Sequence, residues 1–244
     1  MPEGPSIVIL KEAVAEFKGR KVTEVDGNTK VDFSRLEGKK ITDFKSFGKN
    51  FFICFGKKLS VRIHFMLFGT YRINERKETP SRLRLICNKG EMNFYACSVQ
   101  LVEDDLDDLY DWSADVMNDN WDAAKAKKKL KAMPETLLVD ALLDQNIFAG
   151  VGNIIKNEVL YRIQVHPKNK VGDLPAKKLT EMIKQARIYS FDFLEWKKQY
   201  VLKKHWLAHT KKKCSRDGSP IVKEYLGKTN RRTFYCNKCQ ELYK

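Results

Sequence analysis

The sequence lacks any apolar run long enough to cross a membrane, because its longest runs are a handful of residues and a spanning helix needs roughly 20. It also lacks the basic start of a secretory signal, since its first five residues are Met-Pro-Glu-Gly-Pro. Cysteine is scarce, at six residues in 244, and in a chain without an export signal such residues are more often thiols or metal ligands than disulfides. We therefore expect a cytoplasmic protein with no membrane partner.

Acidic residues are few relative to basic ones, with 31 Asp and Glu against 46 Lys and Arg and a formal net charge of +15. The excess is uneven: residues 1–102 carry +8, residues 103–115 hold seven acids and no base, and residues 119–244 carry +14. An acidic segment thus separates two basic blocks, and a polyanion is the partner that such blocks favour. Lysine clusters alone do not decide this, because charge runs are as often solvated faces.

The apolar content, 43% of the chain with 11% aromatic residues, is enough for a packed core and excludes global disorder. Ile7, Leu10, Val14 and Phe17 recur at helical spacing, which predicts a leading helix. Residues 22–102 consist of short β-rich runs broken by glycine-containing turns, which indicates a β-sandwich. Beyond the acidic segment the pattern is helical until the last thirty residues, which are β-like again.

The expected fold class is therefore α+β, with an N-terminal β-sandwich that has a leading helix and a helical C-terminal domain that ends in a β-hairpin. We place the sandwich at residues 1–116, the helical domain at 117–208 and the hairpin element at 209–244. A chain of this length accommodates such a division.

The first site candidate is the N-terminus. Initiator methionine is generally removed before a small residue, so Pro2 is expected to carry a free secondary amine, and a following helix lowers the pKa of such an amine. Attack of this amine on a sugar C1′ gives an iminium, which has no N–H proton to lose and therefore keeps its positive charge. That charge makes the C2′ proton of the sugar removable. Glu3, the next residue, is placed to donate or accept protons in this reaction. A plain helix start with an early proline is the alternative, and this stretch alone favours it.

The second candidate is a metal site near the C-terminus. Cys236 and Cys239 form a Cys-x-x-Cys half-site, and Cys214 and Asp217 have the same spacing about twenty residues earlier. Aspartate is an unusual ligand in a structural zinc site, so His209 is a competing fourth ligand. A hairpin without metal is the remaining alternative.

Two further segments are candidates for phosphate binding. Gly150 and Gly152 allow a tight reversal before a helix, whose first N–H groups and Asn153 amide would form a phosphate seat. An αα-hairpin that needs glycine only for its geometry is the plainer alternative. Residues 230–233, which include Arg231 and Arg232, are expected to form the basic tip of the C-terminal hairpin.

Together these motifs resemble the formamidopyrimidine-DNA glycosylase / endonuclease VIII family, and its endonuclease VIII branch most closely. Each motif is weak alone, but five in the family's order span nearly the whole chain. They are Pro2-Glu3-Gly4-Pro5, Gly48-Lys49, His64-Phe65-Met66-Leu67-Phe68-Gly69, Asp144-Gln145-Asn146 through Gly150-Val151-Gly152-Asn153 as a helix–two-turn–helix, and Arg231 five residues before Cys236-Asn237-Lys238-Cys239-Gln240.

The resemblance implies a bifunctional DNA glycosylase with apurinic/apyrimidinic lyase activity. It would act as a monomer on double-stranded DNA that contains a damaged base or an abasic site, held in a cleft between the two domains, and it would be nucleoid-associated in a bacterium. Pro2 would form the Schiff base, Glu3 would be the general acid, and Lys49 would steady flanking phosphates and serve in the eliminations. No cofactor would take part in catalysis.

The resemblance also implies DNA-binding and metal-binding roles. Asn153, Arg231 and Arg232 would contact DNA, and the family's arginine at the Arg231 position is credited with a part in δ-elimination. An apolar wedge would fill the hole that an extruded base leaves, and a structural Zn²⁺ would be held near the C-terminus. The wedge residues are Met66, Leu67 and Phe68, and the zinc ligands are Cys214, Asp217, Cys236 and Cys239.

Four departures from the family pattern bear on substrate and metal. Asp217 occupies a position at which the family has cysteine, and Met66 occupies one at which the endonuclease VIII branch has glutamine. Asp111 lies near the position at which the family has a DNA-contacting arginine. Residues 96–99 lack the basic, aromatic loop of the 8-oxoguanine-removing branch, which favours oxidised pyrimidines. The sequence leaves open the preferred lesion, the strandedness of the substrate and the balance of β- and δ-elimination.

Two other functions remain compatible with the sequence. The first is a damaged-DNA-binding protein of the same fold that has lost turnover, against which the presence of Pro2, Glu3 and Lys49 argues. The second is a zinc-ribbon protein that binds RNA or structured nucleic acid through charge alone.

Overall fold

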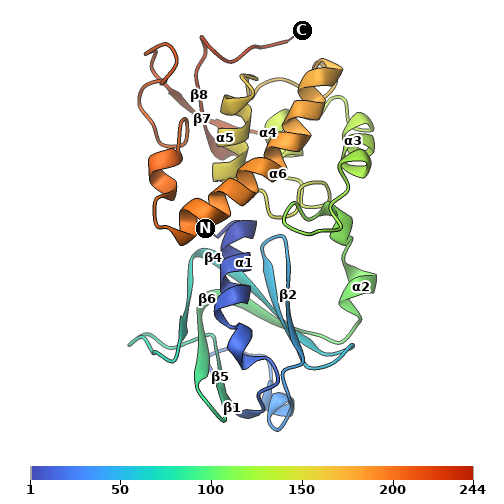
Figure 1. The fold of residues 1–244 in the computed structure, drawn as a ribbon, viewed down its shortest axis with the longest axis vertical. Helices are drawn as coiled ribbons and strands as arrows, with labels where there is room; N and C mark the ends of the chain where they lie inside the picture. The colour runs from blue at the N-terminus through green and yellow to red at the C-terminus, as the bar shows by residue number, and fades with distance from the viewer. Residues whose placement is uncertain (1, 244) are drawn as a thin grey trace. The chain divides into compact units, whose positions relative to one another are not determined.

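The computed structural model describes residues 2–243, which form two compact units, one up to Asp111 and one from Trp112 onward (Figure 1). Each unit has its own hydrophobic core. No helix in the described part of the chain is long and apolar enough to cross a membrane.

The N-terminal unit combines one leading helix with six antiparallel strands. The helix α1 packs against β2 and β3, and its Ile7 and Leu10 lie in the core as the sequence pattern predicts. The elements are α1 (Gly4–Ala13), η1 (Ala15–Phe17), β1 (Val22–Asp26), η2 (Ser34–Leu36), β2 (Asp43–Phe47), β3 (Asn50–Cys54), β4 (Ser60–Ile73), β5 (Leu83–Cys87), β6 (Glu91–Val102) and α2 (Leu106–Leu109).

The six strands form one sheet in the order β1-β5-β6-β4-β3-β2, which is divided into two halves where β4 and β6 change register. The regular pairing of β4 with β6 is interrupted between Phe65 and Thr70, opposite Ala96, whose φ of 49° lies in the left-handed region. Strands β2 and β3 continue one half, and β1 and β5 continue the other.

The inner faces of these halves share one hydrophobic core. Phe51 in β3 and Phe94 in β6 lie with their ring centroids 6.1 Å apart, and both belong to the cluster that also holds the buried side of α1. The α+β class and the N-terminal β-sandwich with a leading helix are thereby confirmed.

The C-terminal unit is helical and ends in a two-stranded hairpin. Its main core lies among α3, α4, α5 and α6, and a smaller apolar cluster lies beneath the hairpin. The elements are η3 (Trp112–Ala114), α3 (Ala123–Lys131), α4 (Leu138–Ala141), α5 (Asn153–Arg162), α6 (Ala176–Lys198), η4 (Leu202–His205), β7 (Val222–Leu226) and β8 (Arg231–Tyr235).

The tip of this hairpin differs from the sequence expectation. Leu226 pairs with Arg231, so the connecting loop is residues 227–230 rather than 230–233. The loop bends at Gly227 and Asn230, which both have positive φ, and its Lys228 N–H donates to Asp140 of α4 at 2.9 Å. Arg231 therefore opens β8 instead of forming the turn, although its side chain is still exposed.

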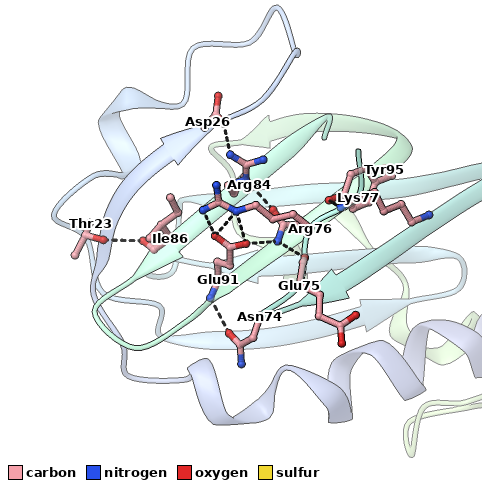
Figure 2. Close-up of polar contacts among 11 residues, drawn as sticks. Thr23, Asp26, Asn74, Glu75, Arg76, Lys77, Arg84, Ile86, Glu91 and Tyr95 are labelled. Atoms are coloured by element: carbon pink, nitrogen blue, oxygen red, sulfur yellow. Dashed lines mark hydrogen bonds and ion pairs between the residues drawn. The ribbon is translucent and has the colours of Figure 1, made fainter. Parts of the chain in front are cut away.

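A polar network stabilises one edge of the sandwich (Figure 2). Arg76 donates to both carboxylate oxygens of Glu91 at 2.5–3.1 Å. Glu91 also accepts from the amide of Asn93 at 2.9 Å, and Arg84 joins Asn93 to Asp26 at 2.9 and 2.7 Å. The network thus ties the segment after β4 to strands β1, β5 and β6.

Replacing Glu91 by Gln is expected to lower the free energy of unfolding by about 1 kcal/mol at pH 7, the order expected for a charged pair with a half-exposed arginine. The hydrogen bonds from Arg76 hold the pKa of Glu91 below its usual value. This stabilisation is therefore complete above the unfolded carboxyl pKa of about 4.3 and is lost as the pH falls through the lower folded value. Thermal unfolding should show the two proteins converging as the pH falls below about 4.

The matched control is Glu75→Gln, because Glu75 is 74% exposed and its carboxylate is 3.7 Å from Arg72. This variant should track the wild type at every pH. A difference between Glu91→Gln and the wild type that stays constant down to pH of about 3 would contradict the assignment.

Candidate functional site

The N-terminal residues lie at the start of a buried helix. Glu3 is the N-cap residue of α1, with extended backbone angles, and its side chain is almost completely buried. Pro2 precedes it and is partly exposed, whereas Met1 lies outside the described residues. Because Ile7 and Leu10 fix α1 in the core, the imino acid and the carboxyl group have a rigid support. The carboxyl group also stands at the positive end of the helix dipole.

Lys49 lies in the turn of the hairpin on which α1 packs. Phe47 pairs with Asn50, so Gly48 and Lys49 form a two-residue loop, and Gly48 has a φ of 55°, which glycine adopts at little cost. Asn50 binds the Nδ1 of His64 on β4 at 3.0 Å.

His64 belongs to one of the sequence motifs, but the motif assigns it no role. Burial lowers its pKa, and the positive charges of Arg62 and Lys49 lower it further. A neutral, half-buried imidazole therefore lies close to the lysine turn at neutral pH.

Met66, Leu67 and Phe68 project from the sandwich at the register break. They are 56%, 58% and 81% exposed, so they do not belong to the strand core. A Cβ on Gly69 would lie 2.7 Å from the Phe65 side chain and 2.9 Å from the Ala96 carbonyl oxygen, so only glycine permits the chain to return this tightly. Three contiguous exposed apolar side chains of this size are candidates for a binding surface.

The base of this projecting segment is braced by Lys77. Its Nζ donates to the Thr70 hydroxyl at 2.5 Å. Its backbone N–H donates to the hydroxyl of Tyr95 at 3.0 Å, and these two residues are drawn in Figure 2. Lys77 follows Arg76, so the polar network of the sandwich edge also supports the segment.

The glycine turn and Asn153 form the start of α5. Gly150 has a φ of 99°, and Gly152 is the N-cap residue. Gln145 holds the turn closed, because its side-chain carbonyl accepts from Gly150 N–H at 3.1 Å and its amide donates to the Val151 carbonyl at 3.1 Å. The amide of Asn153 is thus presented at the positive end of α5.

The structure brings Asn153 together with the hairpin residues. The Nδ2 of Asn153 donates to the Arg232 carbonyl at 2.9 Å. Lys156, which is fully buried, donates to Asn153 Oδ1 and to Thr233 Oγ1, both at 2.9 Å. Sequence reasoning missed Lys156, since its spacing from Asn153 is visible along the helix but Thr233 is far away in the chain.

The four predicted metal ligands lie together. The Sγ atoms of Cys214, Cys236 and Cys239 and a carboxylate oxygen of Asp217 are all within 4.8 Å of one another. Three thiols and one carboxylate oxygen form a donor set that suits tetrahedral Zn²⁺. His209, the competing ligand, does not belong to this cluster; its Nδ1 lies 3.1 Å from the Asn157 amide and its ring packs against Phe234.

Two side chains surround the cluster. The Tyr161 hydroxyl lies 3.0 Å from the Cys214 Sγ. The guanidinium of Arg216 lies over the Tyr161 ring and donates to the Cys239 Sγ at 3.3 Å. Three thiolates and a carboxylate around a divalent cation leave two net negative charges, and Arg216 offsets one of them.

The chain is expected to bind about one Zn²⁺, with Cys236→Ser losing most of it because a thiolate ligand is removed. Asp217→Cys should keep the stoichiometry and bind at least about tenfold more tightly, since thiolates are preferred zinc ligands. Atomic emission gives the stoichiometry, and competition with a chelator gives the affinity. Cys54→Ala, which changes a buried thiol outside the cluster, is the control; equal zinc in the wild type and Cys236→Ser would contradict the site.

Two family models match the chain in succession. Residues 1–97 match the formamidopyrimidine-DNA glycosylase N-terminal domain, and residues 113–189 match the formamidopyrimidine-DNA glycosylase H2TH domain. The first match covers α1 and the sandwich up to the middle of β6, and the second covers α3, α4, α5 and half of α6.

Several known proteins are similar to this chain. "Endonuclease 8-like 3" of Xenopus laevis is 31% identical over 229 residues, which are 86% of this chain and 36% of that protein. "DNA-(apurinic or apyrimidinic site) lyase Nei2" of Mycolicibacterium smegmatis is 28% identical over 77% of this chain and 76% of that protein. The alignments with the Endonuclease 8-like 3 proteins span about a third of those proteins' length.

The fold is also shared with solved structures. A Lactococcus lactis Fpg complex with DNA that contains an oxidized pyrimidine superposes with a TM-score of 0.85, at 20% identity, over 98% of this chain and all of that one.

Proposed function

Because the chain belongs to the formamidopyrimidine-DNA glycosylase family, on its endonuclease 8-like branch, we propose that it is a bifunctional DNA glycosylase and apurinic/apyrimidinic lyase. The observation that carries the proposal is the placement of Pro2 and the buried Glu3 immediately before the first turn of α1. Removal of Met1 would leave the Pro2 nitrogen as a secondary amine on a rigid support.

The chemistry follows from that amine. The Pro2 lone pair bonds to C1′ of the damaged nucleotide as the bond from C1′ to the base breaks, and the base leaves with a proton. The Pro2 nitrogen then loses its proton, and the C1′–O4′ bond breaks as O4′ takes a proton, which leaves the ring-opened sugar joined to Pro2 as an iminium. The iminium withdraws electrons, so loss of the C2′ proton breaks the bond from C3′ to its oxygen and expels the 3′ phosphate. Loss of the C4′ proton in a second elimination expels the 5′ phosphate. Glu3 exchanges protons with the base or the opening ring oxygen.

DNA binding is assigned to residues of both units. Lys49 in the first unit and Asn153, Arg231 and Arg232 in the second contact phosphates. The projecting apolar side chains of residues 66–68 replace the extruded nucleotide in the stack. The exposure of these three residues supports the assignment.

Oxidised pyrimidines are the proposed substrates, in double-stranded DNA. Residues 96–99 lie within β6, so no loop at this position is available to cover an extruded purine. The metal cluster is assigned as a structural Zn²⁺ site that orders the hairpin, with no part in the chemistry.

Borohydride trapping on a lesion-bearing duplex is expected to join the N-terminal peptide covalently to DNA. Pro2→Gly leaves a primary amine and should slow trapping and nicking at least about tenfold, and Glu3→Gln should slow base release more than cleavage of a preformed abasic site. Mass spectrometry of the reduced adduct gives the attachment point.

The control for this experiment is a chain whose N-terminus is blocked by a retained tag. A crosslink in that protein, or a sugar attached elsewhere, would contradict the assignment of Pro2. Lesion binding by the wild type without any nicking would favour the silent damage-binding protein instead.

Phe68→Ala is expected to slow excision from duplex DNA by about 10- to 100-fold, because burial of one aromatic side chain in the vacated stack is worth about 1.5–3 kcal/mol. Single-turnover kinetics on lesion and abasic duplexes provide the measurement, and the abasic duplex should be less affected because it needs less unstacking. Thermal stability should be unchanged, since Phe68 is 81% exposed. Leu109→Ala, another exposed apolar residue of the same unit, is the control, and an equal loss in both variants would contradict the wedge.

A further inference from the structure

One face of α5 holds the first residues of β8 through three polar side chains. Asn153 donates to the Arg232 carbonyl at 2.9 Å, and Lys156 donates to the Thr233 hydroxyl at 2.9 Å. Asn157 accepts from Phe234 N–H at 3.4 Å. Three side chains of one helix thus meet three successive residues of one strand.

Lys156 is the centre of this contact. It is fully buried, and its ammonium group joins Asn153 Oδ1 to Thr233 Oγ1 with two bonds of 2.9 Å. A lysine has three donors and no acceptor, so its bond to Asn153 selects the carbonyl side of that amide. The N–H₂ side of Asn153 is then the side presented to the hairpin and to solvent.

The same contact sets the position of the hairpin arginines. The Thr233 hydroxyl, which accepts from Lys156, donates in turn to the Arg231 carbonyl at 3.1 Å. The chain of bonds therefore runs from the Asn153 amide through Lys156 and Thr233 to the backbone of Arg231. Bonds from a buried charged donor are stronger than neutral ones and more costly to break.

We propose that Lys156 and Thr233 are positioning residues that join the α5 amide and the hairpin arginines into one preorganised phosphate-binding unit, so that Asn153 and Arg231 bind DNA cooperatively. This inference rests on the proposed function, because it concerns how DNA is bound. The inference goes beyond the proposed function because it assigns the coupling of the two phosphate contacts to Lys156 and Thr233, which themselves need not touch DNA.

The coupling has a physical origin in conformational entropy. Two phosphate contacts on independently moving segments each bear an ordering cost when DNA binds. When a bond network holds both segments, that cost is met on folding. Because the Asn153 side chain is itself part of the network, through its bonds to Lys156 and to the Arg232 carbonyl, its removal also loosens the segment that carries Arg231. The effects of removing Asn153 and Arg231 are then non-additive, as for residues that share a network.

A double-mutant cycle tests the coupling. Dissociation constants for Asn153→Ala, Arg231→Ala and the double variant are measured by fluorescence anisotropy on a duplex with a tetrahydrofuran abasic analogue. In the wild-type background the combined effect should differ from the product of the single effects by at least about threefold. In the Thr233→Val background the effects should simply multiply, because the hydroxyl is lost while the side-chain volume is kept.

Two variants separate positioning from general destabilisation. Thr233→Ser keeps the hydroxyl and should preserve the coupling. Lys156→Met should abolish it and weaken binding about tenfold. Lys127→Met, which removes an exposed lysine bond of the same length to the Thr180 hydroxyl, should leave binding unchanged. The salt dependence of binding separates positioning from direct contact: Arg231→Ala should lower the slope by about one, and Thr233→Val should not.

The outcomes distinguish the inference from the function on which it rests. If the wild type binds and nicks lesion DNA but the cycle gives the same result in the wild-type, Thr233→Val and Thr233→Ser backgrounds, the proposed function stands and the coupling is wrong. If the wild type neither binds nor nicks any lesion duplex, both fall. Should Lys156→Met fail to fold, the comparison of Thr233→Val with Thr233→Ser decides.

Discussion

Two helices start next to candidate functional residues, α1 just after Glu3 and α5 at Asn153. Both are buried along one or more faces, and this burial is the constraint on which the candidate site depends. A polar group at a helix start gains from the helix dipole only if the helix end stays in place. The apolar residues of α1 and α5 lie in the two cores, so movement of either helix start would expose apolar surface to water. Polar chemistry at these positions is therefore supported by apolar packing behind it.

The projecting segment of β4 is not held by burial. It forms where the backbone pairing between β4 and β6 is interrupted. Four residues, 66–69, face the single residue Ala96 across the break, and three large apolar side chains are left in water. The loss is confined by what flanks it: Gly69 permits the tight return, Lys77 bonds to Thr70 just beyond it, and the sandwich core resumes on both sides. A stable sandwich can thus expose an apolar tip without losing its own packing.

The fold class could be predicted from the sequence because its signals are local. Helical spacing from Ile7 to Phe17 and glycine-punctuated β runs lie within short windows, and the Cys-x-x-Cys spacing indicated the metal cluster. Other features depend on contacts between distant residues. The Lys156–Thr233 bond joins positions that are 77 residues apart. Ala96 adopts the left-handed backbone conformation, but no glycine at this position marks it in the sequence. The predicted hairpin loop is wrong because Arg231 pairs with Leu226. His209 has the ligand type but is held by Asn157, which no spacing rule reveals.

The aspartate in the metal cluster is best understood together with the hairpin's other anchors. The apolar cluster beneath the hairpin is small, centred on Tyr161, Cys214 and Phe234, and a core of this size cannot order a hairpin alone. The hairpin also has the α5 contacts to residues 232–234 and the Lys228 bond to α4. Because these hydrogen bonds also hold β8 in place, the ordered conformation of the hairpin depends less on the strength of any single metal ligand. A carboxylate in place of a thiolate would then weaken the binding of Zn²⁺ at the proposed site while leaving the arginines of β8 in place.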